Sequence, residues 1–219
     1  MAVSHPRSGA GRSNEPRLFR ALSRRHAGFA ADRVRAAMAT GGGLMPRGKL
    51  VELSPLTDAD SDAMLRWIND RDLVLLSSAY RPVDEADHRE WFNSIRKRRD
   101  VVIFGIREVA GGRLVGSCQL LGINPTHRKA ELQIRIGEAD ARGRGYGREA
   151  VELLLDFAFR DLDLHRVELT VLGGNEPAIK TYLSAGFVKE GTMRQAAHID
   201  GRYVDLVVMG ILRDERPPR

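Results

Sequence analysis

The chain has 219 residues, of which 42% are hydrophobic and 29% are charged. That length and composition suit one folded domain or at most two, and they exclude a wholly disordered protein. The longest apolar run covers only residues 206–212, far short of the roughly 20 residues that a membrane-spanning helix needs, so we expect no membrane partner. Cys118 is the single cysteine, which rules out an internal disulfide and favours a reducing compartment, the cytoplasm. The six histidines are scattered and no metal-binding spacing occurs, so we expect no metal.

The net charge of +6 is concentrated near the N-terminus. Residues 1–48 hold nine arginines against two acidic residues, Glu15 and Asp32, whereas the remaining 171 residues carry 26 basic and 27 acidic side chains. A nucleic-acid-binding domain usually carries its basic excess on the folded body. We therefore do not expect nucleic acid as a partner, unless the N-terminal segment itself binds it.

This Arg-rich N-terminal extension, residues 1–48, is open to several interpretations. Met45 directly precedes a strand-like segment, so translation could begin there, and the residues before it could be an over-extended start or a disordered tail. Within such a tail, Pro16 to Met38 could form a helix. An arginine-rich, acid-poor, amphipathic N-terminus also matches an organelle transit peptide.

Residues 49–121 are expected to form three strands and two helices. Alternating apolar residues predict the first strand, and Thr57 with Asp60 three residues later is typical of a helix start. Acidic residues at 84–87 complement the dipole at the start of the second helix. An apolar run followed by turn residues at 110–113 predicts a hairpin. The expected elements are strands at 49–54, 101–106 and 114–121 and helices at 57–69 and 83–96.

The second half of the chain interleaves strands with helices. Apolar residues at helical spacing after Tyr146 predict a long helix, and Gly186 is suited to close a shorter one. Asp200-Gly201 predicts a turn between the last two strands. The expected elements are strands at 130–136, 167–172, 187–193 and 203–212, helices at 146–159 and 177–185, and a frayed tail at 214–219. The fold class is therefore α+β, without internal repeats.

The most informative segment is the glycine-rich turn between the strand at 130–136 and the helix that follows. Gly143, Gly145 and Gly147 stand at alternate positions, which allows successive backbone N–H groups to point into one concavity. Those donors and the positive end of the helix would bind a phosphate or pyrophosphate, and arginines surround them. The arginines are Arg142, Arg144 and Arg148. The alternative is a turn that merely joins two elements.

Two known phosphate motifs fit this turn poorly. The Walker pattern fails because no Lys-Ser/Thr pair follows the glycines. Gly145, Gly147 and Ala150 formally satisfy the dinucleotide pattern GxGxx[GA]. That motif requires the strand to run directly into its first glycine, whereas Ile136 lies nine residues before Gly145. We therefore disfavour a dinucleotide site.

The segment resembles a known family at this point. Residues 142–147, Arg-Gly-Arg-Gly-Tyr-Gly, match the acyl-CoA pyrophosphate motif [QR]-x-x-G-x-[GA] of the GNAT N-acetyltransferases. Residues 175–187 match the N-x-x-A-x-x-x-Y-x-x-x-G-F segment of the same family. The resemblance covers roughly residues 49–213. Three segments look most like the branch of ribosomal-protein alanine and sugar-amine acetyltransferases: Ala130-Glu131-Leu132 before the turn, and Glu190-Gly191 and Asp200-Gly201 after it.

The resemblance implies a three-layer GNAT fold. Its central sheet would be mixed but mostly antiparallel, with six or seven strands and about four flanking helices. The fourth and fifth strands would splay apart. By analogy, the helices at 57–69 and 84–97 with Trp67, Trp91 and Phe92, together with a loop at 194–202, would wall the acceptor site. Aromatic residues in such positions more often pack in the hydrophobic core than line a binding site.

The resemblance also implies the site residues. Backbone groups near Ile134 and Ile136 would bond the pantetheine arm, and Asn175 would contact the cofactor near its reactive end. The residues that would hold the pyrophosphate are Arg142, Gly143, Arg144, Gly145, Tyr146, Gly147 and Arg148. Tyr182 would give a proton to the departing thiolate, or it is a buried packing residue. Glu131 could act as a base through water, or it is an exposed strand carboxylate; Thr170 stands where some relatives carry an acid.

The expected function is acetyl transfer from acetyl-CoA, as a co-substrate and without a metal, to a primary amine by direct attack in a ternary complex. Candidate partners are a small-molecule amine such as an amino sugar, antibiotic or polyamine, a protein N-terminal amine, and a second copy of the chain. The alternative function is a non-catalytic acyl-CoA sensor on the same fold. Retention of Tyr182 argues against that alternative.

Overall fold

The structure is a computed structural model, and it describes residues 45–216. Most of the Arg-rich extension, residues 1–44, lies outside the described residues. Within residues 45–216, no helix combines the length and the apolar character that a membrane span requires.

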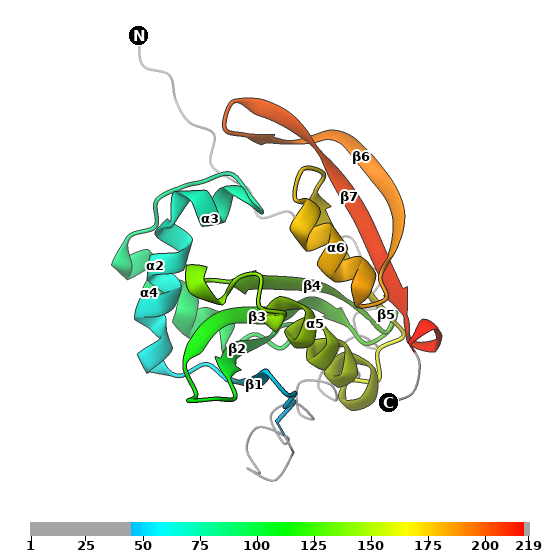
Figure 1. The fold of residues 1–219 in the computed structure, drawn as a ribbon, viewed down its shortest axis with the longest axis horizontal. Coiled ribbons are helices and arrows are strands. Elements are labelled where there is room, and N and C mark those ends of the chain that lie inside the picture. Colours follow the sequence, from blue (N-terminus) through cyan, green and yellow to red (C-terminus); the bar gives the residue numbers. More distant parts are fainter. Residues whose placement is uncertain (1–44, 217–219) are drawn as a thin grey trace, which may run out of the picture.

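A seven-stranded mixed sheet forms the middle layer (Figure 1). Its order is β1-β2-β3-β4-β5-β7-β6, and every pair is antiparallel except β4 with β5. This arrangement confirms the expected mixed, mostly antiparallel sheet. The strands are β1 (Val51–Pro55), β2 (Val102–Glu108), β3 (Leu114–Asn124), β4 (Lys129–Ile136), β5 (Arg166–Leu172), β6 (Val188–Ile199) and β7 (Arg202–Leu212).

Helices cover both faces of the sheet and produce three layers. The α-helices are α2 (Ser61–Asn69), α3 (Arg71–Leu75), α4 (Glu85–Ile95), α5 (Tyr146–Asp156) and α6 (Glu176–Ser184). The main core joins α5 and α6 to the sheet through alternate strand residues such as Phe104 and Leu132. A second apolar cluster, centred on Trp67, Phe92 and Ile103, packs α2, α3 and α4 on the opposite face. Because the side chains of β2 alternate between these clusters, the two helix layers lie on opposite sides.

Local sequence signals placed several element ends correctly. Asp84 accepts a hydrogen bond from Asp87 N at 2.9 Å and starts α4. The backbone N–H of Thr57 donates to the Asp60 carboxylate at 2.7 Å, as the helix-start signal predicted. Gly186 ends the α6 region with φ +99°, a left-handed conformation that favours glycine. Cys118 is buried and free, as expected.

Two elements differ from the sequence prediction. The short helix α3 was not predicted; it begins where the Asp70 carboxylate accepts from Leu73 N at 3.1 Å, and it is too short to show helical periodicity. Strand β6 continues to Ile199, so residues 194–199 are strand and not the expected loop. Nearly every β6 residue is exposed, which removes the apolar alternation by which a strand is recognised. Of the three aromatic residues, Trp67 and Phe92 are core, whereas Trp91 is 38% exposed.

Both ends of the folded domain also extend beyond the predicted limits. The carbonyl of Pro46 accepts a hydrogen bond from Leu53 N at 2.8 Å, so the domain begins before residue 49. At the other end, Arg213–Glu215 form a 3-10 turn, and the Arg216 guanidinium lies 2.8 Å from the Asp156 carboxylate. The expectation of a frayed tail is therefore wrong up to residue 216, because a contact distant in sequence holds it.

Candidate active site

The candidate site lies at the splay, the place where the neighbouring strands β4 and β5 stop pairing. These parallel strands pair only from Lys129↔Arg166 to Glu131↔Glu168, and the ladder then stops although both strands continue. At the paired end, the Lys129 ammonium lies 2.8 Å from the Glu168 carboxylate. The C-terminal half of β4 therefore has a partner on the β3 side alone.

The orientation of the β4 backbone follows from its register with β3. Gly137 N donates to Val115 O at 2.9 Å, so residue 137 bonds toward β3. In an antiparallel pair, bonding toward one neighbour alternates along the strand. Ile134 and Ile136 therefore point their N–H and C=O groups away from β3, toward the side on which β5 no longer pairs with β4. These are the two residues that the resemblance assigned to the pantetheine arm.

The glycine turn leads from this half of β4 into α5. Gly143 and Gly145 have φ of +72° and +83°, a conformation that side chains with a Cβ rarely adopt. The first backbone bond into α5 runs from Glu149 N to Gly145 O at 3.1 Å. Among the described residues, the amides of 143–148 have no acceptor within the protein. The turn thus supplies several free donors at the positive end of a helix, which favours an anion.

The three arginines of this turn have different surroundings. Arg142 turns back: its guanidinium donates to Ile136 O at 3.2 Å and to Gly137 O at 2.8 Å, and its own amide donates to Ala139 O at 3.2 Å. Arg144 lies over the Tyr146 ring at 4.9 Å. Arg148 pairs with Glu152 at 3.0 Å along α5. Arg144 and Arg148 remain half exposed, whereas Arg142 is engaged in holding the end of β4.

Two contacts of the turn come from elements distant in the sequence. The Tyr146 hydroxyl donates to the Glu108 carboxylate of β2 at 3.0 Å; loss of hydration and this hydrogen bond raise the pKa of Tyr146. The Trp67 indole of α2 lies against Gly137, where a Cβ would be only 2.0 Å from the ring, and it donates to Glu138 at 3.1 Å. Sequence reasoning missed Glu108 and Trp67 as supports of the turn, because no local pattern connects them to it.

Asn175 lies at the N-terminus of α6 and connects it to α3. Its side-chain oxygen accepts from Ala178 N at 3.2 Å, and its side-chain amide donates to Leu76 O at 2.8 Å. Both polar atoms of the side chain are therefore used within the protein. Asn175 is placed at the edge of the splay, because β5 ends at Leu172 just before it.

Tyr182 is buried on α6, with its ring 5.8 Å from that of Phe187 in an edge-to-face contact. Burial raises the pKa of Tyr182 to about 12. Within the described residues no hydrogen bond to its hydroxyl is present, yet the hydroxyl oxygen is not sealed from solvent. A protonated, unpaired phenol can donate to an atom brought to it.

Glu131 lies at the last paired position of β4, on the face opposite Leu132. Its carboxylate accepts from Gln133 Nε2 at 3.0 Å. Gln133 in turn accepts from Gln119 Nε2 at 2.9 Å, so two glutamines hold the carboxylate in place. The side-chain oxygen of Gln119, Oε1, is buried without a hydrogen-bond partner within the described residues. Sequence reasoning named Glu131 and missed both glutamines.

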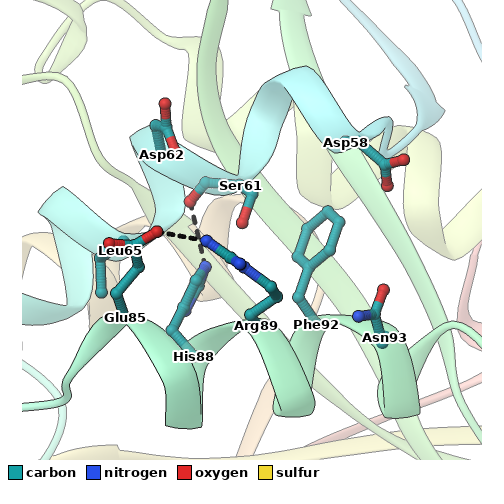
Figure 2. A pocket seen from close by; sticks show the side chains of 9 residues that line it. All are labelled: Asp58, Ser61, Asp62, Leu65, Glu85, His88, Arg89, Phe92 and Asn93. Carbon is teal, nitrogen blue, oxygen red and sulfur yellow. Dashed lines mark hydrogen bonds and ion pairs between the residues drawn. The ribbon is translucent and has the colours of Figure 1, made fainter.

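A cavity of about 300 Å³ lies elsewhere, between α2 and α4. Glu85 and Arg89, one turn apart on α4, pair with each other on one side of it (Figure 2). The His88 ring, also on α4, contacts Ser61 O of α2 at 3.0 Å. Its lining residues are Asp58, Ser61, Asp62, Leu65, Glu85, His88, Arg89, Phe92 and Asn93. None of them comes from β4, α5 or α6, so this cavity is separate from the splay. Among residues 45–216, no group of three or more histidine, cysteine or acidic side chains could hold a metal ion.

Comparisons with known proteins agree with this geometry. The spermidine N(1)-acetyltransferase of Vibrio cholerae is 35% identical over 138 residues, which are 62% of this chain and 76% of that protein. The probable N-acetyltransferase YjcK of Bacillus subtilis is 31% identical over 181 residues, covering 78% of this chain and 98% of that one.

A solved structure is similar over the same region. The spermidine N-acetyltransferase from Vibrio cholerae, crystallised in complex with CoA and spermine, superposes with a TM-score of 0.71 at 28% identity, covering 77% of this chain and 98% of that chain. A family model described as an acetyltransferase (GNAT) domain matches residues 51–188. The chain therefore belongs to the GNAT family of acetyl-CoA-dependent N-acetyltransferases.

Proposed function

We propose that this enzyme transfers the acetyl group of acetyl-CoA to a primary amine by direct attack within a ternary complex. The observation that carries the proposal is the order of two features along the chain: an unpaired half of β4 and, after it, the free amides of the glycine turn. The backbone of β4 loses the β5 partner after Glu131, and beyond Ile136 the chain leads into the free amides at the start of α5. Unpaired strand groups followed by convergent amides suit an extended amide-containing arm that ends in a diphosphate, which is the shape of CoA.

The chain offers distinct groups to each part of that co-substrate. Backbone groups of Ile134 and Ile136 pair with the pantetheine arm, and the amides of 143–148 bind the diphosphate. Arg144 and Arg148 add positive charge beside it, whereas Arg142 fixes the end of β4. Asn175 contacts Leu76 O, so we assign it first to positioning α3 against α6, at the edge where the arm enters.

Attack on the thioester requires a neutral amine. An alkylamine of pKa about 10.4 costs roughly 4–5 kcal/mol to deprotonate at pH 7. Glu131 accepts that proton through a water molecule, with its carboxylate held by Gln133. The amine nitrogen then bonds to the acetyl carbon, and the backbone N–H of Ile134 stabilises the negative charge on the acetyl oxygen.

Tyr182 acts on the departing sulfur. The carbon–sulfur bond breaks and leaves a thiolate, whose ordinary pKa is about 8.5. Full proton transfer from a phenol of pKa about 12 to such a thiolate is unfavourable by roughly 5 kcal/mol. Tyr182 therefore stabilises the thiolate as a hydrogen-bond donor, and the proton lost by the amine returns to the sulfur through solvent.

The acceptor is a small-molecule amine, as in the spermidine acetyltransferases that the chain resembles. A protein N-terminal amine, the branch suggested by Glu190-Gly191 and Asp200-Gly201, is the alternative acceptor. The free, buried thiol of Cys118 supports a reducing compartment, the cytoplasm.

The test is a mass-spectrometric screen of pooled amines, amino sugars and proteins with acetyl-CoA, together with calorimetry of CoA binding. We expect CoA to bind and at least one amine to gain an acetyl group with release of free CoA. Binding of CoA without any product would favour the acyl-CoA sensor. If CoA titration produced no heat, the proposed CoA-binding site would be refuted.

A further inference from the structure

Arg135 is a half-buried cation in the splayed half of β4 that lacks an ionic partner. None of the ion pairs among residues 45–216 includes it. Its guanidinium makes one long hydrogen bond, to Ser77 Oγ at 3.5 Å. Burial lowers the pKa of Arg135 from its ordinary value, but an arginine keeps its charge in a protein. A desolvated cation without a counterion is costly, so an anion delivered to it is favoured.

The nearest acidic group does not supply this counterion. Asp70 attracts Arg135 through space, but no oxygen of Asp70 lies within 4 Å of it. The Asp70 carboxylate instead lies 3.9 Å from Arg142 and accepts from Leu73 N at the start of α3. Asp70 is thus within ion-pair distance of Arg142 and not of Arg135, and Arg135 has no ion pair among the described residues.

We place the approach of the acceptor on the face of β4 that carries Arg135, because α5 and α6 pack on the other face. Arg135 shares its face with Glu131 and Gln133, opposite the residues that pack toward α5. At about 3.3 Å per residue, the Cα atoms of Glu131 and Arg135 are roughly 13 Å apart. The Ile134 backbone, where we place the acetyl oxygen, lies between them. A small molecule can thus place an amine at the reaction centre and a second group at Arg135.

We propose that the acceptor amine carries an anionic group, a carboxylate or a phosphate, and that Arg135 binds it. This inference rests on the proposed function and names its substrate class. It separates this enzyme from a polyamine acetyltransferase, because a polycation would meet the uncompensated Arg135 beside the reaction centre and be repelled.

Matched acceptor pairs test the proposal. The pairs are L-α-amino acids with their α-carboxamides and glucosamine 6-phosphate with glucosamine; spermidine serves as the polycation. We expect kcat/KM to be at least tenfold higher for the anionic member of one pair than for its neutral analogue and for spermidine. The pair that shows the preference distinguishes a carboxylate from a phosphate. Equal or higher kcat/KM for the neutral members or spermidine would overturn the proposal.

Variants assign the preference to Arg135. Arg135→Gln should bring the anionic-to-neutral ratio close to one, and Arg135→Lys should retain part of it. Arg99→Gln, at an exposed position between α4 and β2, is the matched control and should keep the wild-type ratio. A CoA dissociation constant and a melting temperature near wild type show that Arg135→Gln is folded. An unchanged ratio in that variant would refute the assignment.

Calorimetric binding of the same amines to CoA-saturated enzyme separates this inference from the proposed function. If the anionic amines bind to the wild type and not to Arg135→Gln but none is acetylated, the inference holds and the catalytic proposal fails. If only neutral amines are acetylated, the catalytic proposal holds and the inference fails. If no anionic amine is either bound or acetylated, the inference also fails.

Discussion

At the scale of single residues, Tyr182 combines two properties that a packing tyrosine does not need together. Its ring is buried against Phe187, yet its hydroxyl has no hydrogen-bond partner within the described residues and is not sealed from solvent. A phenol that no protein group engages and that solvent can reach is free to donate to an incoming atom. The sulfur of the co-substrate is the atom that we propose for this role.

Tyr182→Phe should therefore lower kcat at least tenfold and leave CoA affinity within about twofold, because it removes one donor to a developing charge. Steady-state kinetics and CoA calorimetry measure the two quantities. The variant should be as stable as wild type, since the hydroxyl makes no bond in the protein. If the variant kept wild-type turnover, Tyr182 would have no role beyond packing.

Burial of Tyr182 also predicts a pH dependence of stability. Its pKa is raised to about 12 in the folded protein and is about 10 in an unfolded chain. Between these values the unfolded state releases the phenol proton and the folded state retains it. The contribution of Tyr182 to stability is therefore complete below pH 10 and is lost as pH rises toward 12. In urea unfolding, raising the pH from about 10 to about 12 should lower the free energy of unfolding less for Tyr182→Phe than for wild type. Equal decreases would contradict the raised pKa of Tyr182.

At the scale of elements, Glu149 attaches the first strand to the helix that begins at the glycine turn. Its carboxylate accepts from the backbone N–H groups of Lys49, Leu50 and Val51, at 2.9, 2.7 and 2.7 Å. No local pattern announces this contact, because the partners are about 100 positions apart in the sequence. The hydrogen bonds hold the edge strand β1 against α5.

Glu149→Ala should lower the free energy of unfolding by roughly 2–4 kcal/mol, the cost of losing several charge-assisted hydrogen bonds. Urea denaturation measures this loss. Glu90→Ala, at an exposed position of α4, is the control and should change it by less than about 0.5 kcal/mol. Equal midpoints for the two variants would show that Glu149 does not stabilise β1.

The splay between β4 and β5 predicts how the hydrogen exchange of individual β4 amides responds to CoA. Ile134 and Ile136 point away from β3 and have lost β5, whereas Gln133 and Arg135 bond toward β3. Saturation with CoA should slow hydrogen exchange at Ile134, Ile136 or both at least tenfold. The amides of Gln133 and Arg135 should be protected with and without CoA, which makes them internal controls. Unchanged exchange at both isoleucines would exclude pairing of the pantetheine arm with this strand.

The glycine turn was predictable from the sequence, because its backbone conformation is encoded locally. Glycines at 143, 145 and 147 marked the turn. The first two have left-handed backbone, and Gly147 lies in the first turn of α5. The splay followed from the family resemblance and not from any residue pattern. Where side chains point was not predictable: Arg142 turns back to Ile136, and Asn175 reaches Leu76, which is 99 positions away. Such contacts depend on tertiary structure, which propensity and periodicity do not contain.

At the scale of the whole molecule, the boundary of the folded domain is set by contacts of residues 46–48. Leu53 N donates to Pro46 O, Gly48 N donates to Val51 O, and Arg47 pairs with Glu52, each at 2.8 Å. Gly48 also lies against the Glu149 carboxyl, where a Cβ would be 2.4 Å away. These residues belong to the domain although the sequence analysis assigned them to the Arg-rich extension.

Two truncations should therefore behave differently although they differ by only five residues. A chain of residues 45–219 should keep the melting temperature and CoA affinity of the full-length protein. A chain of residues 50–219 loses the Pro46 and Arg47 contacts and the Lys49 amide, at a cost of roughly 1–3 kcal/mol, and its melting temperature should fall by about 5 °C. Differential scanning calorimetry and CoA titration compare them. Loss of CoA affinity in the longer chain would mean that residues 1–44 contribute to the site, because every domain contact described from Pro46 onward is retained in it.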